Sequence, residues 1–294
     1  VDGTAKPEIE PVIRFSKFFA ANRNLMVGKR DEEVVMVIPH SQMWSTRNNA
    51  TEATRRCVRA MSYHCMITMN AVSEYRIHTL TTVPKLIVVP APRTLQEKAW
   101  NSLLALVEQG STLLITGVFD DDEHWIPRDR LKKLGIEASV RPVAQHEILV
   151  IDGKEYELNY RGEKIQRIEK AVVRNNSSGN IFTFSYGRGA IIWSPLPVEL
   201  AEDIDPTAAL YTNVLKQAKC SPVFTIEKIN PSVLILPLIF DETALYTFVS
   251  ECDRDVQVKL IHLESNTMIE VNVPAQRTAI IFLDRRDGKI ISRM

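Results

Sequence analysis

The pattern of apolar positions between residues 85 and 117 predicts a strand, a helix and a second strand. Residues 86–89 form a short continuous apolar run, typical of a strand buried on both faces, and a proline ends it. Apolar positions then recur at helical spacing from Thr94, which we expect to cap the helix, to Gly110, which ends it. A second apolar run follows at 113–115. Two buried strands joined by one helix predict a parallel crossover, and therefore an α/β domain.

Similar patterns precede and follow this unit. Upstream, residues 34–39 are typical of a first strand, 51–61 of a helix, and 65–69 of a second strand. Downstream, segments of alternating polarity predict a β-hairpin insertion, at 147–151, 171–174 and 181–185, with a turn at Asp152-Gly153. Residues 190–193 are expected to return to the parallel sheet, and 206–218 to form a closing helix.

The pattern changes after residue 220. No amphipathic helix is evident there, and five short strands are predicted, at 234–239, 244–250, 256–262, 268–273 and 278–283. This predicts a small antiparallel β-sandwich over residues 221–294, after an α/β domain over residues 31–220.

Residues 1–30 precede the α/β domain and contain one amphipathic helix. Pro11 must lie in its first turn, because proline disrupts a helix interior. We expect Ile9, Val12, Ile13 and Phe19 to face inward. The sequence leaves two interpretations open: the tail of a preceding domain, or a native N-terminal helix packed on the sheet.

Composition narrows the class of protein. The 294 residues are 45% hydrophobic, which is ample for two cores, and 36 basic residues balance 36 acidic ones. A neutral chain has no global field that recruits nucleic acid or an anionic membrane, so neither partner is expected. No apolar run is long enough for a membrane helix, and the four cysteines lack CxxC spacing. We therefore expect no metal and no cofactor.

Five segments, in order and spacing, resemble the carboxyl-terminal half of the β-galactosidases of glycoside hydrolase family 42. They are DGTAKPE followed by a helix, VVMVIPHSQMW, KLIVVPAPRTL, EQGSTLLITGVFDDDE and GRGAIIWSPLPVEL. The resemblance covers nearly the whole chain. It implies a flavodoxin-like domain, called the trimerisation domain and related to class I glutamine amidotransferases, followed by a small β domain. Residues 1–30 would then be the remnant of a preceding (β/α)8 barrel.

The resemblance also implies where catalysis takes place. A retaining glycosidase needs two carboxylates about 5 Å apart, and the family places both on barrel strands. The α/β and β regions use all residues after the first thirty, whereas a barrel takes about 250 residues. We therefore expect no catalytic residue here. The expected role is a non-catalytic region that serves oligomer assembly, as a dimer or trimer, and shapes a sugar site together with the barrel.

The amidotransferase chemistry of the related enzymes can be tested on the residues. It needs a cysteine on a sharp turn directly after a buried strand, with a histidine to take its proton. The turn after residues 113–115 carries Thr116-Gly117-Val118 instead. The four cysteines lie elsewhere and are expected to be structural: Cys57, Cys65, Cys220 and Cys252. We expect the amidotransferase site to be lost.

Two loops at the carboxyl ends of predicted strands are candidates for ligand binding, since ligands of open α/β sheets bind there. They are residues 40–44 and 119–125, and they match positions where the resembled family has a tryptophan and an acidic loop. The candidate ligand-binding residues are Trp44, Asp120, Asp121, Glu123, His124 and Trp125. In this interpretation a tryptophan stacks on a sugar while carboxylates accept its hydroxyl hydrogen bonds, and the two loops lie near each other. Alternatively, the tryptophans fill a junction and the acidic loop is solvated.

Other interpretations stay open. Consecutive residues cannot all face one ion, which disfavours a metal at residues 120–124. The alternative function is a free-standing flavodoxin-like small-molecule-binding protein or enzyme with a site between His40 and Asp120. A carbohydrate-binding β domain is a third possibility. It is disfavoured because its aromatic residues, Phe240, Tyr246, Phe248 and Phe282, alternate like core positions.

Overall fold

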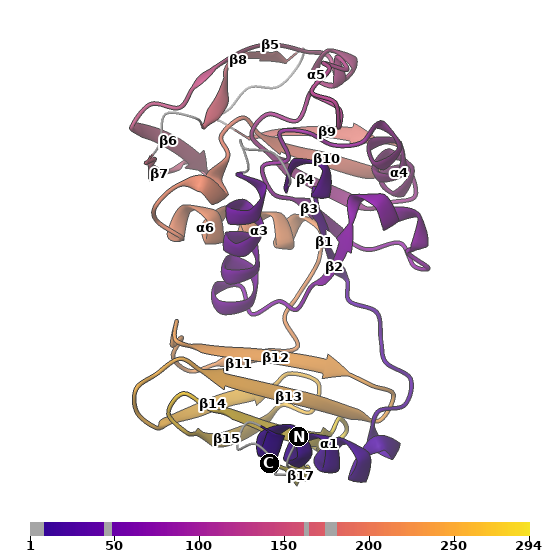
Figure 1. Cartoon of the computed structure of the whole chain (residues 1–294), viewed down its shortest axis with the longest axis vertical. Helices are drawn as coiled ribbons and strands as arrows, with labels where there is room; N and C mark the ends of the chain where they lie inside the picture. Colours follow the sequence, from indigo (N-terminus) through magenta and orange to yellow (C-terminus); the bar gives the residue numbers. More distant parts are fainter. Residues whose placement is uncertain (1–8, 44–48, 162–164, 174–180) are drawn as a thin grey trace, which may run out of the picture. The chain divides into compact units, whose positions relative to one another are not determined.

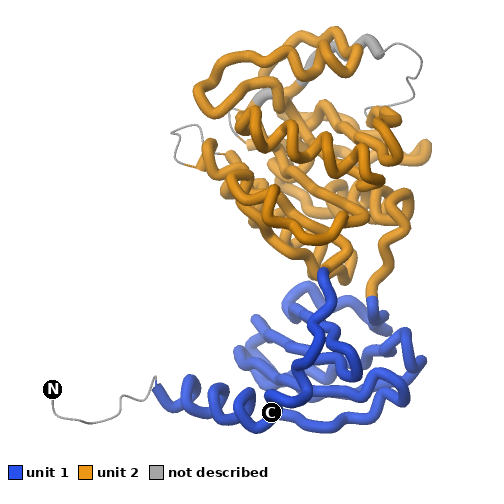
Figure 2. The backbone as a smooth tube through the Cα atoms, turned by 90° about the vertical axis from the view of Figure 1, so that its right-hand side faces the viewer, with its two compact units in different colours: residues 1–31, 223–294 blue, residues 32–222 orange. Residues whose placement is uncertain are grey.

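The computed structural model of the chain describes residues 9–43, 49–161, 165–173 and 181–294. It divides into two compact units (Figure 2): unit 1 comprises residues 1–31 and 223–294, and unit 2 comprises residues 32–222. The N-terminal helix thus belongs to the same unit as the C-terminal strands.

Unit 2 is built on a six-stranded sheet with strand order β2-β1-β3-β4-β10-β9 (Figure 1). Its strands are β1 (Val34–Ile38), β2 (Asn70–Ser73), β3 (Leu86–Val89), β4 (Thr112–Thr116), β9 (Phe182–Tyr186) and β10 (Gly189–Ser194). The predicted crossover is confirmed, because β3 and β4 pair in parallel with Leu86 opposite Thr112. Strand β10 pairs in parallel with β4, and β9 is the antiparallel edge.

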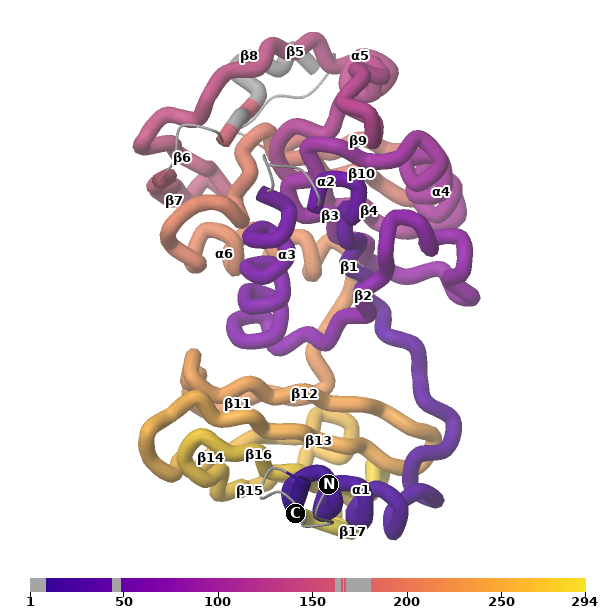
Figure 3. The backbone as a smooth tube through the Cα atoms, in the orientation of Figure 1, coloured from indigo at the N-terminus to yellow at the C-terminus, as the bar shows by residue number. Residues whose placement is uncertain are grey.

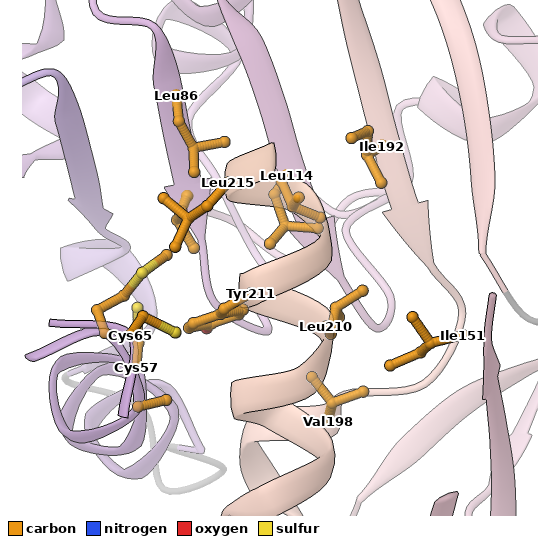
Figure 4. Packing of buried hydrophobic residues seen from close by; sticks show 14 of the residues in the cluster. Cys57, Cys65, Leu86, Leu114, Ile151, Ile192, Val198, Leu210, Tyr211 and Leu215 are labelled. Atoms are coloured by element: carbon orange, nitrogen blue, oxygen red, sulfur yellow. The ribbon is translucent and has the colours of Figure 1, made fainter. Parts of the chain in front are cut away.

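Helices cover both faces of this sheet because its strands alternate apolar side chains between two cores. Met36 enters one core and Val37 the other. The first core lies under α3 (Ala50–Arg59) and α6 (Asp205–Gln217), and Figure 4 shows Tyr211 of α6 beside Cys57 of α3. The second core lies under α4 (Glu97–Glu108).

Two sequence predictions in unit 2 are wrong. Gln96 occupies the N-cap position of α4 without a side-chain cap hydrogen bond, whereas Thr94 is fully buried and its backbone pairs with that of Asp121. Residues 65–69 do not form a strand: α3 continues as a π-helical turn η2 (Ala60–His64), and Met66 has a φ of +57°. A left-handed residue interrupts extended backbone, so β2 starts only at Asn70.

The remaining segments of unit 2 are hairpins and short turns. Strand β5 (Ile136–Pro142) pairs with β8 (Gln166–Val173), and β6 (His146–Ile151) pairs with β7 (Lys154–Asn159). The Asp152-Gly153 turn has the positive φ values, +50° and +79°, that such a hairpin needs, so this prediction is confirmed. Arg174 lies outside the described residues. The helical turns are α2 (His40–Met43), η3 (Glu74–Thr79), α5 (Arg130–Lys133) and η4 (Val198–Leu200).

Unit 1 contains two antiparallel sheets. One comprises β11 (Phe224–Ile226), β14 (Val256–His262) and β15 (Thr267–Val273), and the other β12 (Val233–Ile239), β13 (Thr243–Ser250), β16 (Thr278–Asp284) and β17 (Ile290–Arg293). The five predicted strands are confirmed. Strands β11 and β17 are three and four residues long, too short to give a periodic signal.

Helix α1 (Ile9–Ala21), followed by the turn η1 (Arg23–Leu25), packs within unit 1. The Phe18 ring lies 5.9 Å from that of Phe282, and Phe15 and Phe19 join the same cluster. The expected inward positions Ile9, Val12 and Ile13 are wrong, because these side chains are exposed. The phenylalanines at i, i+3 and i+4 share one face and bury more apolar area, so they set the orientation of the helix.

The segment after α1 is hydrogen-bonded to the sandwich. The Arg30 N–H donates to the Ile239 carbonyl at 2.9 Å, and the Asp241 N–H donates to the Val27 carbonyl at 3.0 Å. Gly28 has a φ of +65°, and a Cβ there would lie 1.9 Å from the Asp241 carboxylate. A larger residue here would be strained by the positive φ and would also require the Asp241 carboxylate to move, so glycine suits this position beside the sandwich.

Candidate functional site

The two predicted loops lie at the carboxyl edge of the unit 2 sheet. One follows β1 and forms α2, and the other follows β4 and runs to α5. Trp44 lies outside the described residues, so its proximity to the second loop stays a prediction. Other residues link the two loops through Thr94. The Ser41 and Thr94 hydroxyl oxygens are 3.5 Å apart, and the Thr94 backbone pairs with that of Asp121.

The three aspartates of the acidic loop bind groups of the protein itself. The Asp120 carboxylate accepts the Leu131 N–H at 3.1 Å, which fixes the start of α5. Asp121 is buried, and its carboxylate accepts hydrogen bonds from two Arg93 nitrogens at 2.9 Å. Burial raises the pKa of Asp121, although Arg93 opposes this shift.

Asp122 organises the outer part of the loop. Its fully buried carboxylate accepts the N–H groups of His124 and Ile126 at 2.8 and 3.0 Å, and Arg128 Nε at 2.7 Å. Burial alone would raise its pKa, but these hydrogen bonds and the Arg128 charge hold the pKa of Asp122 below its usual value. The solvated acidic loop that we considered as an alternative therefore does not describe Asp121 or Asp122.

Glu123, His124 and Trp125 form the outer tip of this loop. His124 is exposed, while Glu123 and Trp125 are half-buried. Trp125 has a φ of +62°, a left-handed conformation uncommon for an aromatic residue. These three predicted binding residues therefore lie beyond the aspartates, whose carboxylates bind Leu131, Arg93 and Arg128.

Tyr75 contacts the first of the two loops, and sequence reasoning missed it. The His40 ring stacks on the Tyr75 ring at 6.1 Å, and His40 Nδ1 lies 2.8 Å from Ser73 Oγ. Burial, then the charges of Glu74 and Glu123, raise the pKa of Tyr75. Tyr75 comes two residues after β2. Because the sequence placed the second strand at residues 65–69, Tyr75 was not recognised as lying at a strand end. The useful signal would have been the cluster Ser73-Glu74-Tyr75 directly after a strand.

The end of β4 is enclosed by buried side chains. Thr116 is fully buried; its hydroxyl lies 2.5 Å from Glu199 Oε2 and accepts the Ala91 N–H at 2.9 Å. Glu199 Oε1 also accepts the Tyr211 hydroxyl at 2.6 Å. Burial raises the pKa of Glu199 because a charged carboxylate is poorly solvated there.

The four cysteines are free thiols, and three of them are buried. Cys57, Cys65 and Cys220 are buried, and Cys252 is half-buried. Burial raises the pKa of Cys57 and Cys65, and that of Cys220 to about 11, which disfavours the reactive thiolate. Among the described residues, no group of three or more His, Cys, Asp or Glu side chains is arranged to hold a metal ion. Within the same residues, no helix has the length and apolar character needed to cross a membrane.

Comparisons with known proteins find likeness in structure only. No protein family and no curated protein matches the sequence. A GH42 β-galactosidase from G. stearothermophilus, Gan42B in its E323A catalytic mutant, matches with a TM-score of 0.62 and 14% identity, over 86% of this chain and 40% of that one. A β-galactosidase from Bacillus circulans sp. alkalophilus matches with a TM-score of 0.63 and 12% identity, over 85% and 41%. The β-galactosidase from Halorubrum lacusprofundi matches with a TM-score of 0.58 and 14% identity, over 88% of this chain and 40% of that one.

These matches define the class of fold, a mixed α/β unit with a partly parallel sheet together with a unit of antiparallel sheets. The chain spans about 40% of the length of the structures it matches. At this identity the likeness concerns the fold. The resemblance inferred from the sequence is confirmed at that level: the chain has the fold of the carboxyl-terminal part of a GH42-like protein.

Proposed function

We propose that this chain is a non-catalytic carboxyl-terminal region of a β-galactosidase-like glycoside hydrolase, serving oligomer assembly and shaping of the sugar site. The observation that carries the proposal is the fold match over 86% of this chain and 40% of Gan42B. Within this proposal unit 2 is the flavodoxin-like domain. Its strand order β2-β1-β3-β4-β10 supports this, because it corresponds to the 2-1-3-4-5 order of flavodoxin-like sheets.

The engagement of the acidic side chains supports a non-catalytic role. Retaining glycosidases need two carboxylates about 5 Å apart that face the substrate. At the carboxyl edge of unit 2, Asp121 binds Arg93 and Asp122 binds Arg128, and Glu199 is enclosed. The Thr116 turn likewise lacks the thiol of an amidotransferase.

Assembly is the second part of the proposal. Three neighbouring apolar side chains of α1, Ile9, Val12 and Ile13, are 44%, 62% and 44% exposed. Exposed apolar groups of this kind favour a partner, which in the proposed parent protein is the barrel or a second subunit. We propose a dimer or trimer; the resemblance of unit 2 to the trimerisation domain of family 42 supports a subunit contact through unit 2 as well.

A second candidate function is binding of a small molecule, such as a carbohydrate, between His40 and Asp120. One observation favours it. Tyr75 is 46% exposed and stacks on His40, and the charge of Glu123 contributes to the raised pKa of Tyr75. An aromatic ring beside a carboxylate suits a sugar, because the ring packs against its C–H face and the carboxylate accepts its hydroxyls.

The two candidates are separable by experiment. The purified chain, incubated with p-nitrophenyl β-galactoside, is expected to release no nitrophenol above the buffer blank, and to release no ammonia from glutamine. A chain with the double substitution Asp121→Asn and Glu123→Gln, purified identically, controls for contaminants. Hydrolysis that scales with the wild-type chain and disappears in this variant would refute the non-catalytic proposal. Calorimetric binding of galactose that is lost in Tyr75→Ala would favour the second candidate.

A further inference from the structure

The crossover direction of unit 2 reverses between β1 and β3. The chain passes from β1 to β2 on one side of it, and then to β3 on the other side. In open α/β sheets the crevice beyond the carboxyl ends of the strands at such a reversal receives the ligand. In this chain, the backbone next to that position is Ser41 after β1 and Gln96 between β3 and α4.

The carboxylate of Glu74 occupies this position. Glu74 follows β2 and is 2% exposed. Its Oε1 accepts the Ser41 N–H at 2.5 Å, and its Oε2 accepts the Gln96 N–H at 2.8 Å. One carboxylate therefore connects the segments that follow β2, β1 and β3, through two backbone donors from different segments.

The arrangement matches recognition of a free carboxylate. A buried carboxylate is costly unless donors satisfy its oxygens, and each oxygen of Glu74 has a donor. The two donors belong to the backbone, so they stay in place when the Glu74 side chain is changed. Two fixed N–H groups that serve two oxygens of one planar group suit a carboxylate better than an amide, whose NH₂ would face a second donor.

We propose that the Ser41 and Gln96 N–H groups form a carboxylate-binding site that the chain fills with its own Glu74. The wild-type chain is then closed to anionic ligands at the reversal point. Removal of the Glu74 side chain opens the site to small planar monocarboxylates, such as formate. This inference concerns the backbone of unit 2 and holds whichever proposed function is correct.

The test is chemical rescue of Glu74→Ala with sodium formate. Thermal unfolding is followed by tryptophan fluorescence, which reports unit 2 because Trp44, Trp100, Trp125 and Trp193 all lie in it. Formate at ten times its dissociation constant is expected to raise the Tm of this variant by roughly 3–6 °C. Sodium chloride at equal ionic strength and neutral formamide are the controls, and neither should reproduce the rise. In wild type, formate and chloride should act alike.

Amide NMR locates the effect, and a second variant tests the geometry. Formate added to ¹⁵N-labelled Glu74→Ala should shift the Ser41 and Gln96 amide signals. Glu74→Gln fills the site but replaces one acceptor with NH₂, so its Tm should fall below wild type without a formate-specific recovery. The proposal is overturned if chloride rescues Glu74→Ala as well as formate does, if the shifts miss both amides, if Glu74→Ala stays unfolded in formate, or if Glu74→Gln is as stable as wild type.

Discussion

Replacing Glu199 with glutamine should change how the stability of unit 2 depends on pH. Glu199 is fully buried between Thr116 Oγ1, at 2.5 Å, and the Tyr211 hydroxyl, at 2.6 Å. A protonated carboxyl group presents one O–H donor and one carbonyl acceptor, and a glutamine side chain presents the same pair. Glu199→Gln should therefore preserve both contacts while removing the titration.

The direction of the Glu199 pKa shift determines whether stability rises or falls with pH. Burial raises the folded-state pKa of Glu199 above the ordinary value of 4.5. Below pH 4.5 both states hold the proton, and the stabilisation is fully present. As pH rises above 4.5 the unfolded chain releases its proton while the folded chain keeps it, so stability is lost until the folded pKa is reached.

Between pH 4.5 and the folded-state pKa, the folded chain holds one more proton than the unfolded chain, and this sets the slope of stability against pH. The free energy of unfolding of wild type should fall by about 1.4 kcal/mol per pH unit relative to Glu199→Gln. By contrast, Glu199→Leu removes the hydrogen-bond partner of two buried hydroxyls, those of Thr116 and Tyr211. Each unpartnered hydroxyl costs about 1–3 kcal/mol, so this variant should lose about 2–6 kcal/mol near pH 4.5, where the wild-type carboxyl is protonated.

Urea unfolding between pH 4.5 and 8, followed by tryptophan fluorescence, measures these differences in unit 2. Glu52→Gln is the matched control, because the Glu52 side chain is 54% exposed and pairs only at the surface with Arg56. It should give curves parallel to wild type. If the Glu199→Gln and wild-type stabilities also ran parallel across this pH range, Glu199 would share its pKa between folded and unfolded states, and the reasoning would be refuted.

Three further predictions concern unit 1 and assembly. Phe18→Ala should lower the free energy of unfolding of unit 1 by about 2 kcal/mol, whereas Val12→Ala on the 62% exposed position should change it by less than about 0.5 kcal/mol in urea unfolding followed by circular dichroism. Burial lowers the pKa of His262, so unit 1 should lose stability as pH falls below 6.5, and His262→Gln should remove this loss; an unchanged slope in thermal unfolding would contradict it. The chain should sediment as a dimer or trimer at micromolar concentration, and a single monomeric boundary would contradict this.

The strands and helices that could be predicted are those whose signal is local. The run at β3, α4 and β4 carries its own apolar periodicity, and so does each of the five longer strands of unit 1. The start of α4 could not be predicted, because Thr94 is held by its pairing with Asp121, a contact between segments far apart in sequence. The orientation of α1 was mispredicted for a similar reason: the helix has apolar residues on two faces, and Phe282 decides which face is buried.

In the candidate site, too, contacts between segments far apart in the sequence could not be predicted, here those of the charged residues. The sequence places an acidic loop after β4, and the loop is there. It does not reveal that Arg93 and Arg128 neutralise two of its aspartates, because pairing of charges depends on the folded positions of both partners. Tyr75 was missed because an edge strand of four residues gives almost no periodic signal, so the loop after it had no assigned place.

At the carboxyl edge of unit 2, two positions next to strand ends are filled by carboxyl groups of the chain itself. Glu74 occupies the point of reversal beside β1, and Glu199 encloses Thr116 at the end of β4. Among the residues that the structure describes, Tyr75 and the His124 tip of the acidic loop are polar or aromatic groups that stay accessible farther out. A small substrate enclosed by this unit alone would have to displace internal hydrogen bonds, each costly to leave unmade when buried. Groups at the rim can instead contact a sugar held by another part of a larger protein, which is the arrangement that a region shaping the site of an adjoining domain requires.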